Sequence, residues 1–145
     1  MRAETGVGVP DPGPAGKLTL AGIDVNNNQI RDDVEFFIAT RYATSQKTVQ
    51  GLNQIAIAIQ KEILATTRDQ SFAAATESDR AMECLTYIGA PRTGWRAVLA
   101  LSTNTNARYK AWAAHEGRLS GGAFPSCPIG EWKTSCKFNP DALPN

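Results

Sequence analysis

The chain is organised around the residues Asp24-Val25-Asn26-Asn27-Asn28-Gln29-Ile30-Arg31-Asp32-Asp33-Val34-Glu35. Oxygen-bearing side chains occupy the first, third, fifth, ninth and twelfth places of this stretch, on Asp24, Asn26, Asn28, Asp32 and Glu35. An EF-hand-type loop places its ligands at these offsets and so supplies most of the roughly six to eight oxygen ligands that calcium takes. The spacing therefore predicts a calcium site. Its ligands would be the side chains of Asp24, Asn26 and Asn28, the main-chain carbonyl of Ile30, a bidentate Glu35 and, through water, Asp32.

Two departures from an ideal loop predict that calcium binds weakly. Gln29 stands at the sixth place, where glycine normally makes a sharp turn with positive φ, and a side chain there costs roughly 1 kcal/mol. Asn26 and Asn28 carry no charge, so we expect an affinity near the roughly 10⁻⁴–10⁻³ M of extracellular modules. The alternative interpretation is a polar Asn-rich turn in which Asp32 and Asp33 merely favour a helix N-terminus.

Length and composition are typical of one globular domain. The chain has 145 residues, of which 42% are hydrophobic and 20% charged, and such a length allows a real core. The net charge is only +1 and the basic residues are scattered, which argues against nucleic-acid binding. No apolar run approaches the roughly 18 residues of a membrane span.

The hydrophobic periodicity predicts an all-α fold, a compact bundle of four or five helices with the EF-hand-like loop at the start of the first. The expected helices run from Asp32 to about residue 42, over about 46–66 with Ser45 as its cap, over about 70–88, around 95–101 and over about 105–117. Residues 1–16, rich in proline and glycine, are expected to form a flexible linker, and a strap that lies over the surface is the alternative. Residues 17–145 would form a single helical domain, ending in an irregular tail over 120–145.

The three cysteines, Cys84, Cys127 and Cys136, lack the spacing of a zinc knuckle, and His115 is the only histidine, so we do not expect a structural zinc site. One disulfide and one leftover thiol are expected if the chain is exported. No signal peptide opens the sequence, so the protein is either cytosolic or begins after a removed signal. The low charge of the predicted calcium loop favours export, because calcium is abundant outside cells.

No catalytic motif accompanies these features. The sequence contains no Gly-rich phosphate loop, nucleophile elbow or H-E-x-x-H, and no Ser or Cys motif accompanies His115. We therefore predict no catalytic residue and no enzyme, and the sequence assigns no protein partner. Two classes of function remain. One is an exported non-catalytic domain whose loop fixes the N-terminal segment onto the helices. The other is a small-ligand carrier or enzyme, which a cavity with convergent polar groups between helices would favour.

Several stretches together resemble a known group of proteins. They are Pro10-Asp11-Pro12-Gly13, Ala15-Gly16-Lys17 and Leu20-Ala21-Gly22-Ile23-Asp24-x-Asn26-x-Asn28-x-Ile30-Arg31-Asp32-Asp33-Val34. This pattern is similar to the opening of uncharacterised exported bacterial proteins that carry a thrombospondin-type-3 or dockerin-like calcium loop. Met82-Glu83-Cys84 and Ser135-Cys136-Lys137-Phe138 resemble the two cysteine segments of that group.

The resemblance spans most of the chain and implies a periplasmic or cell-surface location and a bridge between Cys84 and Cys136. Cys127 would then be the odd thiol, whereas a bridge between Cys127 and Cys136 is the local alternative. The group usually has glycine at the sixth loop place, so Gln29 departs from its pattern. No activity is implied.

Overall fold

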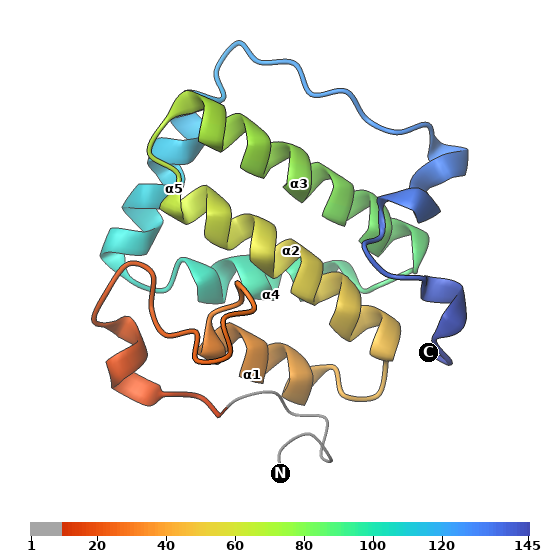
Figure 1. Ribbon diagram of the computed structural model, residues 1–145, viewed down its shortest axis with the longest axis horizontal. Helices are drawn as coiled ribbons and strands as arrows, with labels where there is room; N and C mark the ends of the chain where they lie inside the picture. The colour runs from red at the N-terminus through yellow and green to blue at the C-terminus, as the bar shows by residue number, and fades with distance from the viewer. Residues whose placement is uncertain (1–9) are drawn as a thin grey trace.

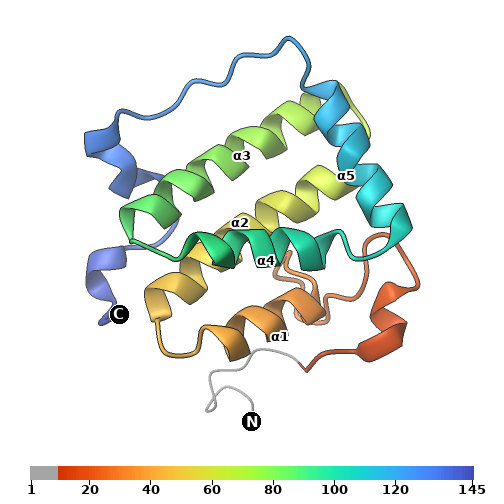
Figure 2. The same ribbon diagram turned by 180° about the vertical axis from the view of Figure 1, so that it is seen from behind.

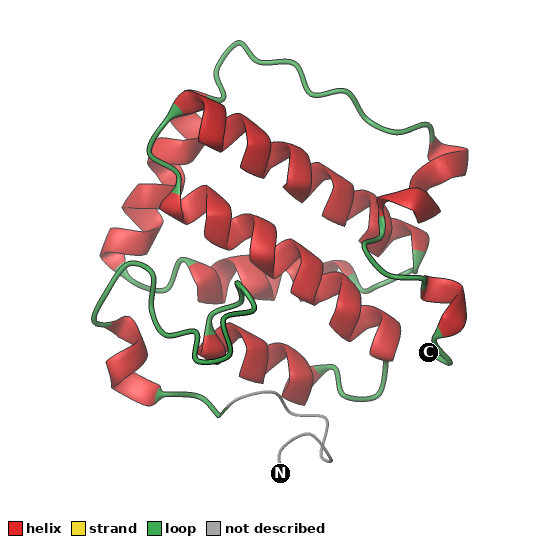
Figure 3. Ribbon diagram, viewed as in Figure 1, coloured by secondary structure: helices red, strands yellow, loops and turns green. Residues whose placement is uncertain are grey.

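The computed structural model describes residues 10–145. Within them the chain forms α-helices and short 3-10 helices and no strand (Figure 3). The α-helices are α1 (Asp32–Arg41), α2 (Gln46–Leu64), α3 (Arg68–Tyr87), α4 (Arg92–Ser102) and α5 (Asn106–Arg118). The 3-10 helices are η2 (Gly13–Lys17), η3 (Ile129–Ser135) and η4 (Pro140–Ala142). The predicted all-α bundle is confirmed, and each predicted helix is present within a few residues of its expected bounds.

Helix α2 is the central element of the bundle. It lies between α1 and α3 in Figure 1, with α4 behind it, and Figure 2 shows α4 crossing it from the other side. It contacts α1, α3, α4 and α5. An unusually wide apolar surface makes this position possible, because its buried side chains include Leu52, Ile55, Ala58, Ile59 and Ile63. A helix that is apolar on several faces is stable only when it is covered on several sides.

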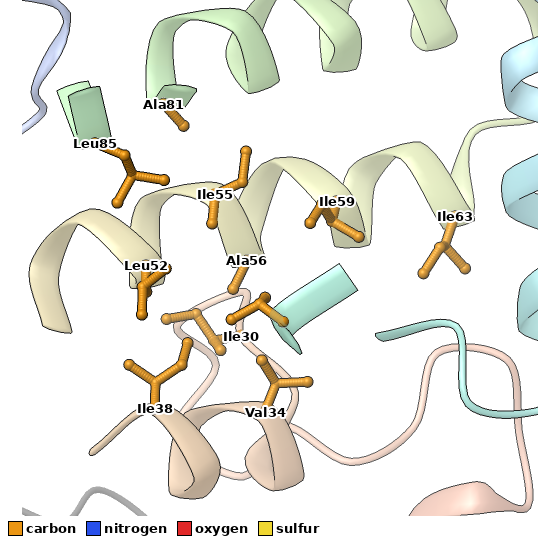
Figure 4. Packing of buried hydrophobic residues seen from close by; sticks show 11 residues of the cluster. Ile30, Val34, Ile38, Leu52, Ile55, Ala56, Ile59, Ile63, Ala81 and Leu85 are labelled. Atoms are coloured by element: carbon orange, nitrogen blue, oxygen red, sulfur yellow. The ribbon is translucent and has the colours of Figure 1, made fainter. Parts of the chain in front are cut away.

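The core joins the predicted calcium loop to the helices (Figure 4). Ile30 is 4% exposed and packs with Val34 and Ile38 of α1 against the face of α2 that carries Leu52 and Ala56. Full burial of one such aliphatic side chain contributes about 1.5–3 kcal/mol. The loop is therefore anchored at Ile30 by the same packing that holds α1.

Short polar side chains begin three of the α-helices, as the sequence suggested for α2. The Ser45 hydroxyl accepts the N–H of Thr48 at 3.2 Å and so confirms the predicted cap. Thr67 caps α3 and Thr105 caps α5 in the same way. A cap of this kind contributes about 1 kcal/mol by satisfying an otherwise unpaired N–H.

Only part of the predicted flexible linker falls within the described residues. Residues 1–9 of that linker lie outside the described residues. The remainder contains η2, whose Gly16 is buried. The fully buried Arg108 of α5 donates hydrogen bonds to the carbonyls of Gly16, Thr19 and Leu20 and to Asn104 Oδ1. The guanidinium that holds this segment is thus roughly ninety residues away in the chain. A prediction from the proline content of the segment alone could not include this contact.

A second buried guanidinium lies beside the first. Arg31 is 2% exposed; it pairs with Asp33 and donates to the carbonyls of Leu101 and Ser102 at the end of α4. Gly22, with φ +70°, passes between the two arginines. A Cβ there would lie 2.8 Å from Arg31 Cδ and 2.9 Å from Arg108 Nη2. Only glycine fits this position, both for its backbone conformation and for its space.

The tail after α5 is held by α2 and α3. Cys84 of α3 and Cys136 form a disulfide, as the resemblance implied, and Cys127 is the free thiol. Gln54 donates to the Ser135 carbonyl and accepts from the Lys137 N–H, both at 2.9 Å. The predicted irregular tail therefore includes two ordered turns, η3 and η4, which these contacts position. Among residues 10–145 no helix is both long and apolar enough to cross a bilayer.

Replacement of Gly22 by alanine is expected to lower the free energy of unfolding by about 2–4 kcal/mol. The new Cβ meets both arginines, and the backbone keeps a conformation that L-residues avoid. Gly117→Ala is the matched control, because Gly117 lies inside α5 with open space around it, and there alanine should gain up to about 1 kcal/mol. Urea denaturation measures both. Equal stabilities for the two variants would contradict this account of Gly22.

Reduction of the disulfide should cost on the order of 4 kcal/mol in the chain-entropy model, because Cys84 and Cys136 are 52 residues apart. Peptide mapping without reductant should give a linked Cys84–Cys136 peptide and one thiol at Cys127. A peptide that links Cys127 to Cys136, or three free thiols, would contradict the pairing.

Candidate functional site

The predicted calcium loop joins the N-terminal segment to α1. Its last four residues form the first turn of α1, so Asp32 and Glu35 lie at the positive end of the helix dipole. The N–H of Asp32 donates to the Ile23 carbonyl at 2.8 Å and brings the two ends of the loop together. The loop is therefore closed by the main chain and anchored by the burial of Ile30.

The loop backbone takes the conformation that the sixth place of a calcium loop requires. Gln29 has φ +72° and Asn27 has φ +55°. Asparagine visits this left-handed region readily, whereas glutamine pays roughly 1–2 kcal/mol there. The turn thus forms although Gln29 opposes it, which means that contacts elsewhere in the fold impose it.

Three of the predicted ligand side chains point toward one another. The side-chain amides of Asn26 and Asn28 donate to Glu35 Oε1 at 3.5 and 3.0 Å. Rotation of each side-chain amide by about 180° would exchange its nitrogen and oxygen atoms, so that both amide oxygens would point toward Glu35. For Asn28 this rotation would break the hydrogen bond that its Oδ1 accepts from the Ile30 N–H at 3.0 Å.

The other two predicted carboxylates bind the loop backbone. Asp24 accepts the N–H groups of Asn28 and Gln29 at 3.2 and 2.8 Å, and Asp32 accepts the N–H of Val25 at 3.2 Å. Burial raises the pKa of the Asp32 carboxyl, and the charges of Asp24 and Glu35 act in the same direction, against the Val25 hydrogen bond. The carboxylates of Asp24 and Glu35 therefore lie close enough to Asp32 to repel its charged form.

Asp33, which the loop spacing does not include among the ligands, pairs with Arg31 at 2.7 Å between Nη2 and Oδ2. Among the described residues no three His, Cys, Asp or Glu side chains come close enough to hold a metal ion. The predicted set also includes amide and carbonyl oxygens, on Asn26, Asn28 and Ile30. Hard oxygen donors of this kind suit calcium and do not suit zinc.

The sequence reasoning missed a second polar centre, around Glu62 of α2. This carboxylate is 8% exposed in its side chain and accepts from Ser78 Oγ of α3 at 2.7 Å and from Trp112 Nε1 of α5 at 3.3 Å. Helical periodicity could have found it, because Glu62 follows Ile55 by two turns and therefore lies on the apolar face.

His115 lies beside Glu62 and is completely buried. Its Nε2 is 3.4 Å from Glu62 Oε2 and 3.7 Å from Glu116 Oε2, and neither ring nitrogen has a hydrogen-bond partner among the described residues. Ser78 donates to the carboxylate and not to the imidazole. The contacts are therefore not in the order of a nucleophile, a base and an orienting acid, and the absence of catalysis at His115 stays a prediction.

The environment of this centre disfavours charge. Burial raises the pKa of Glu62 to about 7, and the charges of Glu116 and Asp79 add to this, against the hydrogen bonds from Ser78 and Trp112. Burial, with the nearby charge of Arg118, lowers the pKa of His115. Both groups therefore tend toward their neutral forms.

A comparison of the chain with protein-family models, with curated proteins and with solved structures finds no match.

Replacement of Glu62 by glutamine should raise the free energy of unfolding above pH 7, by up to roughly 3 kcal/mol. The pKa of Glu62 is about 7 in the folded chain and 4.5 as a free group, so the parent loses stability as the pH rises between these values. The gain from glutamine should shrink as the pH falls through the same window.

Urea denaturation of parent and variant over this pH range measures the difference. His115 has the opposite effect on the pH dependence of stability. Because its pKa is lowered in the folded chain, stability falls as the pH drops below about 6.5. His115 is present in both proteins, so its effect is common to both curves. A variant that is less stable than the parent by the same amount at every pH would contradict the argument.

Proposed function

We propose that the chain is an exported, non-catalytic domain whose loop, Asp24 to Glu35, binds calcium weakly and thereby fixes the N-terminal segment onto the helices. The observation that carries the proposal is the backbone of Gln29. Its φ of +72° is the one that a calcium loop needs at this place, although glutamine disfavours it.

The arrangement of the loop side chains supports the same proposal. Asn26 and Asn28 already meet at Glu35, so two amide rotations would direct three oxygen-bearing groups at one ion. Calcium would also offset the repulsion among Asp24, Asp32 and Glu35, which burial makes more costly. Because Glu35 belongs to α1 and Asp24 to the incoming segment, an ion between them would tie the segment to the bundle.

Export is supported by the Cys84–Cys136 disulfide, since disulfides persist mainly in oxidising compartments such as the periplasm and the cell surface. Calcium at those locations reaches the concentrations that a weak site needs. The function proposed for the ion is structural, because an ion between Asp24 and Glu35 would hold the incoming segment against α1.

The second candidate function, a small-ligand carrier, is favoured by one specific observation. A cavity of about 240 Å³ lies between helices α2, α3, α4 and α5, and Glu62 is part of its wall. Its lining combines apolar side chains with a few polar groups, the combination that characterises ligand sites.

Calcium at millimolar concentration should raise the thermal midpoint of the parent, whereas micromolar calcium should have little effect. Binding to the folded chain alone contributes about 1.4 kcal/mol at ten times the dissociation constant. Gln29→Gly should enlarge the shift, because glycine adopts the required φ freely, and Glu35→Gln should abolish it by removing the bidentate ligand.

Melting curves with calcium, with magnesium and with a chelator test these expectations. Glu131→Gln, an exposed residue in η3, is the matched control and should keep the full response. If the parent and Gln29→Gly both ignore millimolar calcium, the loop is a polar turn that only shares the ligand spacing.

A further inference from the structure

The cavity between the helices has an apolar wall that is rich in large side chains. Ile55 and Ile59 come from α2, Met82 from α3, Trp95 and Leu99 from α4 and Trp112 from α5. Phe124, from the segment after α5, also lines it. At about 240 Å³ the cavity exceeds the roughly 150 Å³ that accepts benzene in an engineered core. It has room for one aromatic ring or for a short branched aliphatic chain.

The opposite end of the cavity is acidic. Glu62, Asp79 and Glu116 line it together with Ser78, and no lysine or arginine of residues 10–145 does so. Glu62 is buried, Asp79 is half-buried and Glu116 is exposed. Burial raises the pKa values of both Glu62 and Asp79, and neighbouring carboxylates add to the effect, although the charge of Arg80 opposes it at Asp79. The positive charge that would balance these groups is absent from the lining.

His115 does not line the cavity itself, but it leaves a polar group unpaired beside this end of it. Its imidazole is fully buried, and its Nε2 lies 3.4 Å from Glu62 Oε2 and 3.7 Å from Glu116 Oε2 without a hydrogen bond. A buried polar group without a partner costs about 1–3 kcal/mol. Arg118, whose charge acts on His115, is already engaged with the Ala65 carbonyl and Ser71 Oγ. Ser78 and Trp112 donate to Glu62, but no positively charged side chain of the described residues lines this end of the cavity.

We propose that this cavity binds a small organic cation in which an aromatic or aliphatic body carries one ammonium group. The body would lie against Trp95 and Trp112, and the ammonium would donate to Glu62, with the carboxylates of Asp79 and Glu116 elsewhere in the same lining. A Trp face also attracts a cation directly, which adds about 0.5–2 kcal/mol. A neutral ligand of the same shape would leave the carboxylates unbalanced, and an anionic one would be repelled.

This inference deepens the carrier function and does not depend on calcium. Glu62 and the loop ligands lie on different sides of α2, since Ile30 and Val34 pack on one face while Ser78 and Trp112 meet Glu62 on another. Failure of one proposal therefore leaves the other standing.

Three probes of one size test the charge requirement: 2-phenylethylamine, 2-phenylethanol and phenylacetate. Calorimetry on the full chain with its disulfide intact should show that the amine binds at least about tenfold more tightly than the alcohol, as a charge-assisted hydrogen bond predicts. Phenylacetate should not bind. Equal binding of amine and alcohol, or no binding of the amine, would overturn the proposal.

Two variants locate the site. Glu62→Gln keeps the shape of the side chain and should weaken binding of the amine by about tenfold, whereas the exposed Glu116→Gln should weaken it by about threefold. Glu131→Gln, which removes the same charge far along the chain in η3, should bind as the parent does. Circular dichroism checks that each variant is folded. If Glu62→Gln does not fold, Glu116→Gln decides, and unchanged binding in that variant refutes the assignment.

Each titration is run with a chelator and again with millimolar calcium. The amine should bind equally in both conditions. Binding of the amine that appears only with calcium would overturn the independence of this site, whereas a missing calcium response in the melting curves bears on the loop alone.

Discussion

Two buried guanidinium groups connect the parts of this structure that helix packing alone would leave separate. Arg31 and Arg108 lie on either side of Gly22, and both are almost completely removed from solvent. A buried charge is tolerable only when acceptors surround it. Arg108 finds them in the N-terminal segment, and Arg31 finds them at the end of α4. The need to satisfy two arginines thus fixes the segment against the bundle.

The strained loop follows from the same constraint. Gln29 is held at positive φ between two fixed points, since the buried Ile30 and the hydrogen-bonded Arg31 come directly after it. A residue in an unfavoured conformation persists when its surroundings determine it more strongly than its own preference does. Here those surroundings are the core packing of Ile30 and the carbonyl acceptors of Arg31. The loop conformation is therefore a property of the whole fold.

The two polar centres place similar side chains in opposite environments. In the loop, Glu35 meets amides near the surface, where a hydrated cation could reach it. In the interior, Glu62 meets a serine, an indole and an imidazole between apolar side chains. The first environment suits an inorganic cation with several oxygen ligands. The second suits a ligand that brings apolar surface together with its charge, so the two proposed sites would differ in the kind of cation that they take.

The sequence by itself determined the helices, because apolar periodicity and caps such as Ser45 are local signals. It also placed the ligand-like spacing of Asp24 to Glu35, and the resemblance pointed to the Cys84–Cys136 bridge. Tertiary structure alone decided the contacts between distant residues: Arg108 with Gly16, Gln54 with Ser135, and Glu62 with His115. The first two pairs leave no periodic trace, since each partner resembles an ordinary polar residue in its local sequence. The periodicity of α2 does place Glu62 on the apolar face, but it does not show which partner Glu62 meets. Only the packing of five helices shows which polar groups lose water and which partners they then find.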